Sequence, residues 1–325
     1  MKWYESPYLL VTLIVVLLLF ITLTGSTLCL ALIVPPLMLL LIYVIQQPQI
    51  LTAPVAVVHN ARATRLNQRN NISEAIRLYT RAIDRNPHFT QPLNNRGLLY
   101  MESGRYDEAL ADFNAALKLN ESLGNAFAGR GKIHEIRGDI PAAMADWDRA
   151  EQLNAPMLFL LRGDYNLRVG KHLDALRDFE QAVRLNPSNA VAHNNAAYLN
   201  SLVGDVNQAL KYSRVALEKE PAIAGFYGTR GHIEYQRKDY QAALSNFLKA
   251  SELKRDYPFG LAGQAVAYYA IGSHREARRV WDYLLEAFPQ YEDVYTLQRV
   301  YGVIGPFFED AQRVSALAPQ EEADA

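Results

Sequence analysis

Arginine recurs at one position of a regular pattern along the chain, in most cases directly before a glycine. In three places an aspartate follows sixteen residues later, while Asn246 follows Arg230 and Leu78 follows Arg62 at the same distance. A planar guanidinium binds a carboxylate through two parallel hydrogen bonds. We therefore expect ion pairs that join neighbouring helices, and the alternative is a ladder of arginines that binds a ligand. The predicted pairs are Arg96 with Asp112, Arg130 with Asp146, and Arg162 with Asp178.

The remaining titratable residues form no catalytic or metal-binding pattern. The seven histidines lie at scattered positions, and His134-Glu135 lacks the second histidine that a zinc-protease helix needs. No nucleotide-binding loop or nucleophile elbow is present, and the single Cys29 rules out a disulfide or a Cys-rich metal centre. With 33 basic and 34 acidic residues, bulk charge gives no reason to expect nucleic acid. We expect no catalytic residue, no metal or other cofactor, no nucleic-acid partner and no small-molecule substrate.

Alanine marks the period of the pattern. It recurs at spacings of 34, 34, 32, 34, 34 and 34 residues, with a bulky side chain four residues later in six of the seven periods. Each period reads as two amphipathic helices joined by a turn, in which the small alanines let the helices approach closely. One unit cannot bury its apolar face alone, so stacked neighbours must supply the core. The alanines are Ala75, Ala109, Ala143, Ala175, Ala209, Ala243 and Ala277, and the bulky residues are Tyr79, Phe113, Trp147, Phe179, Phe247 and Trp281.

This pattern resembles the tetratricopeptide repeat family over roughly residues 56–289. The unit that begins at Thr90 carries the family's residues most completely, with Gly97, Tyr100, Ala109, Phe113 and Ala116 in register. The resemblance implies an all-α fold, in which helix-turn-helix units stack into a right-handed superhelical solenoid.

The period also sets the expected boundaries. Residues 290–319 read as a degenerate helix pair that caps the array with a polar outer face, and residues 320–325 as a disordered acidic tail. The 32-residue spacing at Asn154-Ala155-Pro156 predicts a shortened turn and a local change of pitch. After a linker at 51–55, seven units are expected at 56–89, 90–123, 124–155, 156–189, 190–223, 224–257 and 258–289.

Residues 1–50 read as a membrane anchor. The 38 residues from Tyr8 to Ile45 carry no charge, which is too long for one ordinary span of about 20 residues. A polar turn at Thr24-Gly25-Ser26-Thr27 divides the run into two short transmembrane helices, at about 8–23 and 28–45. The alternatives are a single bent or re-entrant segment and a processed signal, although the apolar run resumes directly after its first part.

The basic residues near this hairpin predict its orientation. Lys2 precedes the first span, the loop between the spans has no basic residue, and six arginines lie between residues 62 and 85. The positive-inside rule then places both ends in the cytoplasm. We therefore expect an integral protein of a bacterial inner (plasma) membrane with a cytoplasmic repeat array, unless these arginines serve only the helices that carry them.

In the tetratricopeptide repeat family, the first helix of each unit lines a concave groove. The resemblance places two asparagine pairs there, similar to the amides that some relatives use to hold a peptide backbone. In some members of the family, lysines and asparagines clamp the C-terminal carboxylates of a chaperone, and this chain does not reproduce that set in one block of units. The alternative to a binding role is that the residues at the groove positions are ordinary solvated side chains. The candidate groove residues are Asn94, Asn95, Lys132, Glu135, Asp164, Arg168, Asn194, Asn195, Tyr198, His232 and Tyr235.

The resemblance implies a membrane-anchored scaffold that binds other proteins or peptides in its groove and contacts the lipid bilayer through the hairpin. Assembly or maintenance of a membrane complex is the role that such an arrangement suggests. The alternative is a regulatory adaptor subunit of a membrane protease or transferase, in which the transmembrane hairpin itself contacts the partner. The rubredoxin-like metal knuckle of some such adaptors needs cysteines that this chain lacks.

Overall fold

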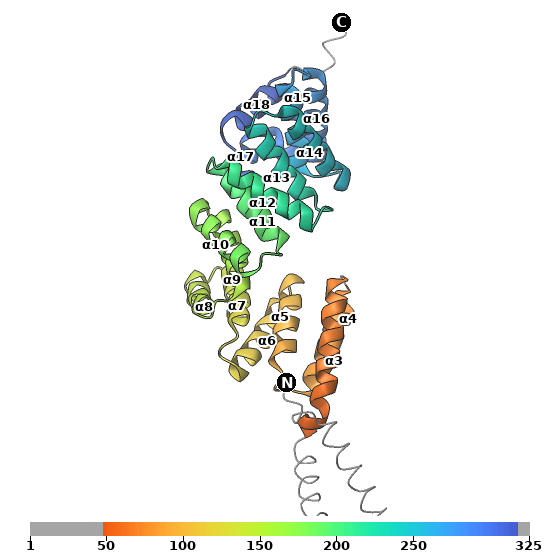
Figure 1. Cartoon of the computed structure of the whole chain (residues 1–325), viewed down its shortest axis with the longest axis vertical. Coiled ribbons are helices and arrows are strands. Elements are labelled where there is room, and N and C mark those ends of the chain that lie inside the picture. The colour runs from red at the N-terminus through yellow and green to blue at the C-terminus, as the bar shows by residue number, and fades with distance from the viewer. Residues whose placement is uncertain (1–47, 70, 318–325) are drawn as a thin grey trace, which may run out of the picture. The chain divides into compact units, whose positions relative to one another are not determined.

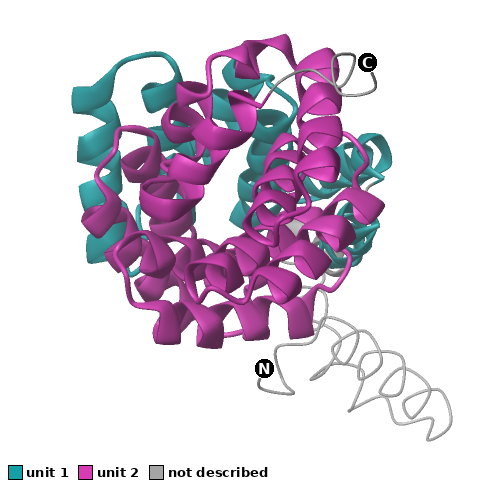
Figure 2. Cartoon of the chain, turned by 90° about the horizontal axis from the view of Figure 1, so that it is seen from above, with its two compact units in different colours: residues 1–155 teal, residues 156–325 magenta. Residues whose placement is uncertain are grey.

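The computed structural model describes residues 48–69 and 71–317, which form 16 α-helices, one short 3-10 helix and no strand (Figure 1). These helices fall into two compact units that divide between Ala155 and Pro156 (Figure 2), and each unit is described by itself. The membrane hairpin expected at residues 8–45 and the acidic tail lie outside the described residues. Within the described residues, none of the helices combines the length and the apolar character that a membrane span requires.

The first unit contains three helix pairs in its described part. Helix α3 begins at Pro48, so residues 51–55, which were expected as a linker, lie inside this helix. Pro54 lies in this stretch and disfavours a helix interior, but α3 continues through it to Gln68. The pairs are α3 (Pro48–Gln68) with α4 (Ile72–Arg85), α5 (Thr90–Glu102) with α6 (Tyr106–Leu119), and α7 (Gly124–Ile136) with α8 (Ile140–Gln152).

The second unit contains four further pairs. From α5 onward, the first helix of every pair begins at the first residue of an expected repeat unit. The pairs are α9 (Pro156–Arg168) with α10 (His172–Leu185), α11 (Ala190–Leu202) with α12 (Val206–Lys219), α13 (Ala224–Gln236) with α14 (Tyr240–Leu253), and α15 (Pro258–Ala270) with α16 (His274–Ala287).

The alanines and the bulky residues between them form the core of each pair. All seven alanines of the main row are fully buried, and Phe113, Trp147 and Phe247 are equally inaccessible. Glycines of the first helices make room for these rings. A Cβ atom at Gly97 would lie 2.9 Å from the Phe113 ring, and one at Gly129, in the next first helix, would lie 2.6 Å from it. One aromatic ring thus fills the space between two successive first helices, which explains why each unit needs its neighbour.

The turns inside the pairs depend on left-handed backbone. Gly104 and Gly138 have φ values of 73° and 81°, which glycine adopts without steric cost. Lys238 stands at the corresponding place between α13 and α14 and still takes φ 62°. The shortened connection before α9 also uses a left-handed residue, Asn154 at φ 51°. Asparagine is among the few residues that tolerate this conformation.

Successive first helices approach each other more closely than successive second helices do. In the first unit α5 contacts α3 and α7, and in the second unit α13 contacts α11 and α15. The first helices therefore lie on the inner side of the bend within each unit. We call the surface that they present there the first-helix face.

The C-terminal segment, residues 291–317, does not continue the array as a further stacked pair. After the 3-10 helix η2 (Pro289–Glu292), α17 (Tyr295–Tyr301) has only seven residues, and α18 (Gly305–Ser315) packs against α13, α15 and α16. The expected cap at 290–319 therefore covers the first-helix face and does not extend the stack. Helix α15 explains this, because all of its residues from Phe259 to Ala267 are buried, and this consecutive run covers every side of the helix. A helix that is apolar all round must be covered all round.

Candidate binding face of the first helices

The structure brings each predicted arginine–aspartate pair together. Nε and Nη2 of Arg96 donate to the two carboxylate oxygens of Asp112, both at 2.7 Å. Arg130 binds Asp146 in the same way, at 2.8 and 2.7 Å. Nη2 of Arg162 donates to Asp178 Oδ1 at 2.8 Å. Every pair joins the first helix to the second helix of one repeat, and all three aspartates are buried.

Two of the arginines also hold the preceding repeat. Nη1 of Arg96 donates to Oγ1 of Thr80 at 2.8 Å, and Nη1 of Arg130 donates to Oδ1 of Asn114 at 2.7 Å. Each guanidinium therefore links three helices of two successive pairs. The hydrogen bonds that both arginines donate to their paired aspartates raise the pKa of each guanidinium above its usual value. With all three nitrogens engaged, these side chains act as structural links and not as a ladder for an external ligand.

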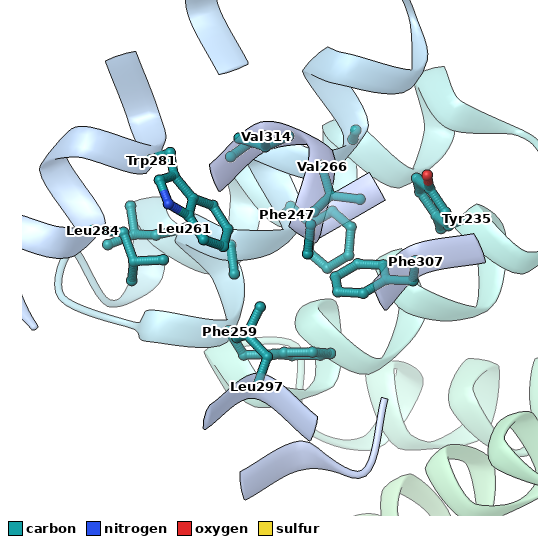
Figure 3. Packing of buried hydrophobic residues seen from close by; sticks show 14 of the residues in the cluster. Tyr235, Phe247, Phe259, Leu261, Val266, Trp281, Leu284, Leu297, Phe307 and Val314 are labelled. Atoms are coloured by element: carbon teal, nitrogen blue, oxygen red, sulfur yellow. The ribbon is translucent and has the colours of Figure 1, made fainter. Parts of the chain in front are cut away.

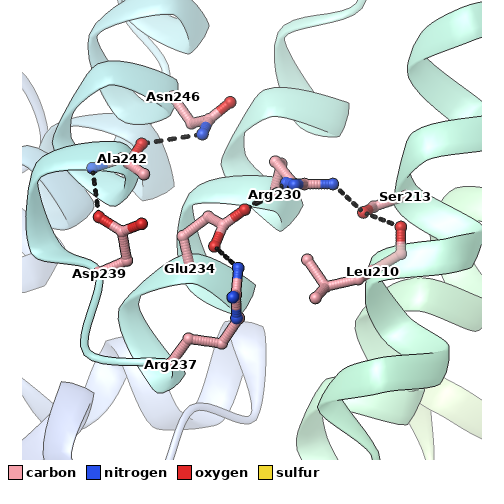
Figure 4. A network of polar contacts seen from close by, with 8 residues as sticks. All are labelled: Leu210, Ser213, Arg230, Glu234, Arg237, Asp239, Ala242 and Asn246. Carbon is pink, nitrogen blue, oxygen red and sulfur yellow. Dashed lines mark hydrogen bonds and ion pairs between the residues drawn. The ribbon is translucent and has the colours of Figure 1, made fainter.

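Arg230 differs from this scheme and does not bind Asn246, the residue sixteen positions later. Its guanidinium binds Glu234, one helical turn further along α13, with Nη2 to Oε1 at 2.6 Å (Figure 4). Arg237 binds the other carboxylate oxygen of Glu234 at 2.8 Å. Asn246 instead donates to the carbonyl oxygen of Ala242. A carboxylate on the same helix face is a stronger partner for arginine than a neutral amide on the next helix.

Both asparagine pairs of the first helices adopt the same arrangement. Nδ2 of Asn94 donates to Oδ1 of Asn95 at 3.3 Å, and Nδ2 of Asn194 donates to Oδ1 of Asn195 at 3.4 Å. Oδ1 of the first asparagine in each pair is buried and has no hydrogen-bond partner within the described residues. The amides are therefore partly exposed polar groups whose hydrogen-bonding capacity the fold does not use up.

Four other candidate groove residues bind each other on their own helices. Nζ of Lys132 lies 2.9 Å from Oε2 of Glu135, and both side chains are largely buried on α7. Nε of Arg168 lies 3.2 Å from Oδ2 of Asp164 on α9, and both of these side chains are about half exposed. The first pair is part of the packed face, while the second remains accessible.

The last three candidate groove residues are covered by the C-terminal segment. Tyr198 donates a hydrogen bond to the carbonyl oxygen of Tyr301, and Tyr235 donates to the carboxylate of Asp310. His232 is fully buried, with its Nδ1 3.2 Å from Oγ of Ser201. The expectation that these three side chains line an open groove is therefore corrected, because residues of the same chain already contact them.

The buried His232 predicts a pH dependence of stability. Burial lowers its pKa from 6.5 to about 4. The groups that face it, the Tyr198, Phe259 and Phe307 rings and the Ser201 hydroxyl, offer no charge to a protonated imidazole. The unfolded chain takes up this proton below pH 6.5, and the folded chain takes it up only near pH 4. The free energy of unfolding therefore falls as the pH decreases from 6.5 to 4. At pH 5 the loss is on the order of 2 kcal/mol.

Chemical denaturation of the chain at pH 7 and pH 5 measures this loss. A His232→Gln variant should lose much of the pH dependence, whereas His88→Gln, at an exposed position, should retain it. An equal pH dependence in all three proteins would show that other groups cause the effect.

Comparison with known proteins assigns the repeats. The tetratricopeptide repeat family matches residues 91–123 and 160–200. A TPR repeat-containing protein of Methanocaldococcus jannaschii is 23% identical over 239 residues, covering 71% of this chain and 39% of that protein. The Hsp70-Hsp90 organizing protein of Triticum aestivum is 22% identical over 219 residues, covering 55% of this chain and 38% of that protein. The chain thus spans less than half the length of these two relatives.

Solved structures agree in fold. A chain of the APC/C hetero-tetramer Cut9-Hcn1 superposes with a TM-score of 0.61 at 16% identity, covering 80% of this chain and 49% of that chain. The pilF structure of Pseudomonas aeruginosa superposes with a TM-score of 0.51 at 14% identity, covering 69% and 96%. At these identities the likeness concerns the fold alone. Together with the 34-residue helix pairs, the family matches at residues 91–123 and 160–200 show that the chain contains tetratricopeptide repeats.

Proposed function

We propose that this protein is a membrane-anchored scaffold that binds partner proteins or peptides on its first-helix face. Tetratricopeptide repeats indicate a protein–protein interaction scaffold, and relatives include a protein named for organizing Hsp70 and Hsp90. Such scaffolds are generally not enzymes, and we extend this to the present chain. The role that we assign is the assembly or maintenance of a membrane complex.

The two asparagine pairs carry this proposal. Arg96, next to the first pair, is bonded to Asp112 and Thr80, whereas within the described residues the amides of Asn94, Asn95, Asn194 and Asn195 bond only within each pair. An amide both donates and accepts hydrogen bonds, so it can bind the backbone of an extended peptide without demanding a particular sequence. The same arrangement occurs in both units, which supports a common role.

Site-specific photo-crosslinking in cells tests the binding face. A photoreactive residue in place of Leu98, on the first-helix face of α5, is expected to give protein adducts. The same residue in place of the exposed Met144, on the second helix α8, is expected to give few. Adduct yield from position 98 should fall at least tenfold in an Asn94→Ala/Asn95→Ala variant, because the partner's backbone loses its hydrogen bonds.

The matched control is Asn207→Ala, which removes an exposed asparagine from the second helix α12. It should leave the adducts from position 98 unchanged. Adducts that persist in the Asn94→Ala/Asn95→Ala protein would remove the asparagine pairs from the proposal, and adducts only from position 144 would move binding to the second helices.

The membrane anchor is proposed from the uncharged residues 8–45. A cysteine introduced beside Gly25, in a chain whose Cys29 is changed to serine, should react with a membrane-impermeant maleimide added to the outside of intact cells. A cysteine introduced at the exposed Asp148 should react only after lysis, because the array is expected in the cytoplasm. Labelling of position 148 in intact cells would contradict this orientation.

Exchange of the hairpin for an unrelated anchor separates the two functional alternatives. If the first-helix face alone selects the partner, crosslinking from position 98 is retained. If the hairpin contacts the partner, as in an adaptor subunit, crosslinking is lost although the protein still reaches the membrane.

A further inference from the structure

The C-terminal segment occupies a part of the first-helix face that α9, in the same unit, leaves exposed. Asp164, His232 and Val266 hold the same position in the first helices α9, α13 and α15. Asp164 is exposed, whereas His232 and Val266 are fully buried. Helix α18 packs against α13 and α15, so it accounts for the difference. We call this covered area, on α11, α13 and α15, the late first-helix face.

Four buried side chains hold α18 on this face, and one of them, Phe307, makes ring contacts with α13 and α14; the four are Phe307, Phe308, Ala311 and Val314. Phe307 is 1% exposed and lies next to Phe247 (Figure 3), with ring centroids 6.2 Å apart. Its ring also meets Tyr235 edge to face at 5.2 Å and His232 at 5.3 Å. These distances and tilts are those of favourable aromatic pairs, so the face provides a shaped site for one aromatic ring.

A carboxylate three residues further along α18 makes the second contact. Asp310 accepts a hydrogen bond from the Tyr235 hydroxyl, and burial keeps that hydroxyl a neutral donor by raising its pKa. Residues three apart lie on one side of a helix, so Phe307 and Asp310 reach the face together. The Tyr198 hydroxyl binds the backbone carbonyl of Tyr301 just before α18. An aromatic ring, a carboxylate and a main-chain carbonyl are the contacts that a bound peptide makes.

The segment is attached in a way that allows it to open separately. Gly302 and Gly305, with φ values of 66° and 62°, reverse the chain direction at the junction of α17 and α18. Helix α18 has 11 residues, too few to be stable without a surface to pack on. Beneath it, Nε2 of His232 is buried with no hydrogen-bond partner within the described residues, which weakens the contact.

We infer that the late first-helix face is a binding surface for a helix with an aromatic residue followed three positions later by a carboxylate. The C-terminal segment occupies this surface as an internal ligand, and a partner protein that carries such a helix replaces it. This inference rests on the proposed function and names the partner class for one part of the first-helix face.

A fluorescent peptide with the sequence of residues 301–317 tests the inference on the full-length protein. In fluorescence anisotropy it should bind a Phe307→Ala/Asp310→Asn variant at least tenfold more tightly than the unmodified protein, because the internal ligand is released. A peptide with the same two changes should not bind. The matched control variant is Ile304→Ala/Glu309→Gln, at two exposed positions of the same segment, and it should bind no more peptide than the unmodified protein.

Amide hydrogen exchange of the unmodified protein provides a measurement that needs no variant. The amides of residues 305–315 should exchange at least tenfold faster than the protected amides of α13 and α15, through an opening that leaves the repeats folded. Equal protection of α18 and α15 would overturn the inference, as would failure of the peptide to bind the variant.

Two outcomes distinguish this inference from self-association of the chain and from the proposed function. A dimer in sedimentation velocity that disappears in the Phe307→Ala/Asp310→Asn variant would make a second copy of this chain the occupant, and would overturn a partner helix. Peptide binding is measured on purified protein, whereas the proposed function is measured by crosslinking from position 98 in the first unit. Failure of one measurement therefore leaves the other intact.

Discussion

Replacement of Asp146 by asparagine is expected to lower the free energy of unfolding of its part of the array by about 3 kcal/mol. The change keeps the shape of the side chain and removes its charge, so Arg130 remains largely buried without its ionic partner. The Arg130 and Asp146 side chains are 24% and 9% exposed, and the Nη2 to Oδ1 distance is 2.7 Å. Loss of one member of such a pair costs more than the intact pair contributes. Urea denaturation followed by circular dichroism measures the change.

Asp148 provides the matched control on the same helix. It lies two residues further along α8 and is exposed. Asp148→Asn should change the free energy of unfolding by no more than about 0.5 kcal/mol. Equal effects of the two substitutions would show that the Arg130–Asp146 pair is not a structural link, and would return the arginines to the list of candidate ligand contacts.

Replacement of Phe307 by alanine is expected to weaken the docking of α18 by about 3 kcal/mol, the usual scale for a large side chain removed from a packed site. The ring lies among Tyr235, His232, Phe247 and Phe259. Hydrogen exchange of the α18 amides should accelerate by roughly a hundredfold. The helices α5 to α8, in the first unit, should keep their protection.

Ile304→Ala is the control for this prediction, because Ile304 is 56% exposed in the same segment. It should change the exchange of α18 only slightly. If Phe307→Ala instead lowers protection equally in all pairs of the second unit, the segment is an integral part of the core and not a separately docked helix.

Much of the architecture is predictable because every repeat poses the same packing problem. Alanine, glycine and one bulky residue must recur at fixed positions for a ring such as Phe113 to fit between two first helices. The same regularity gives the arginine–aspartate pairs, since a spacing of sixteen residues returns to the facing position on the second helix. The same spacing in the opposite direction leads from Arg96 to Thr80 and from Arg130 to Asn114, the contacts that hold the preceding repeat.

The sequence does not predict that part of the first-helix face is covered. The position of a residue within the repeat does not indicate where a degenerate C-terminal helix pair will pack. Ala311 keeps the alanine phase and is buried, but its helix packs across α13 and α15 and not beyond α16 as a further pair. A usable signal exists in the first helix at 258–270, whose lone side-chain amide is Gln264 and which has no charge. Such a helix cannot leave one side in water, so a cover for it could have been expected.

The central claim is that the arginine row holds the repeats together while the asparagine pairs contact the partner. The most direct test compares Asp146→Asn with Asn94→Ala/Asn95→Ala in one experiment, by melting temperature and by crosslinking yield from position 98. We predict that Asp146→Asn lowers the melting temperature and leaves crosslinking at low temperature unchanged. Asn94→Ala/Asn95→Ala should instead lower the crosslinking yield and leave the melting temperature unchanged. Loss of crosslinking at an unchanged melting temperature in Asp146→Asn would contradict the claim.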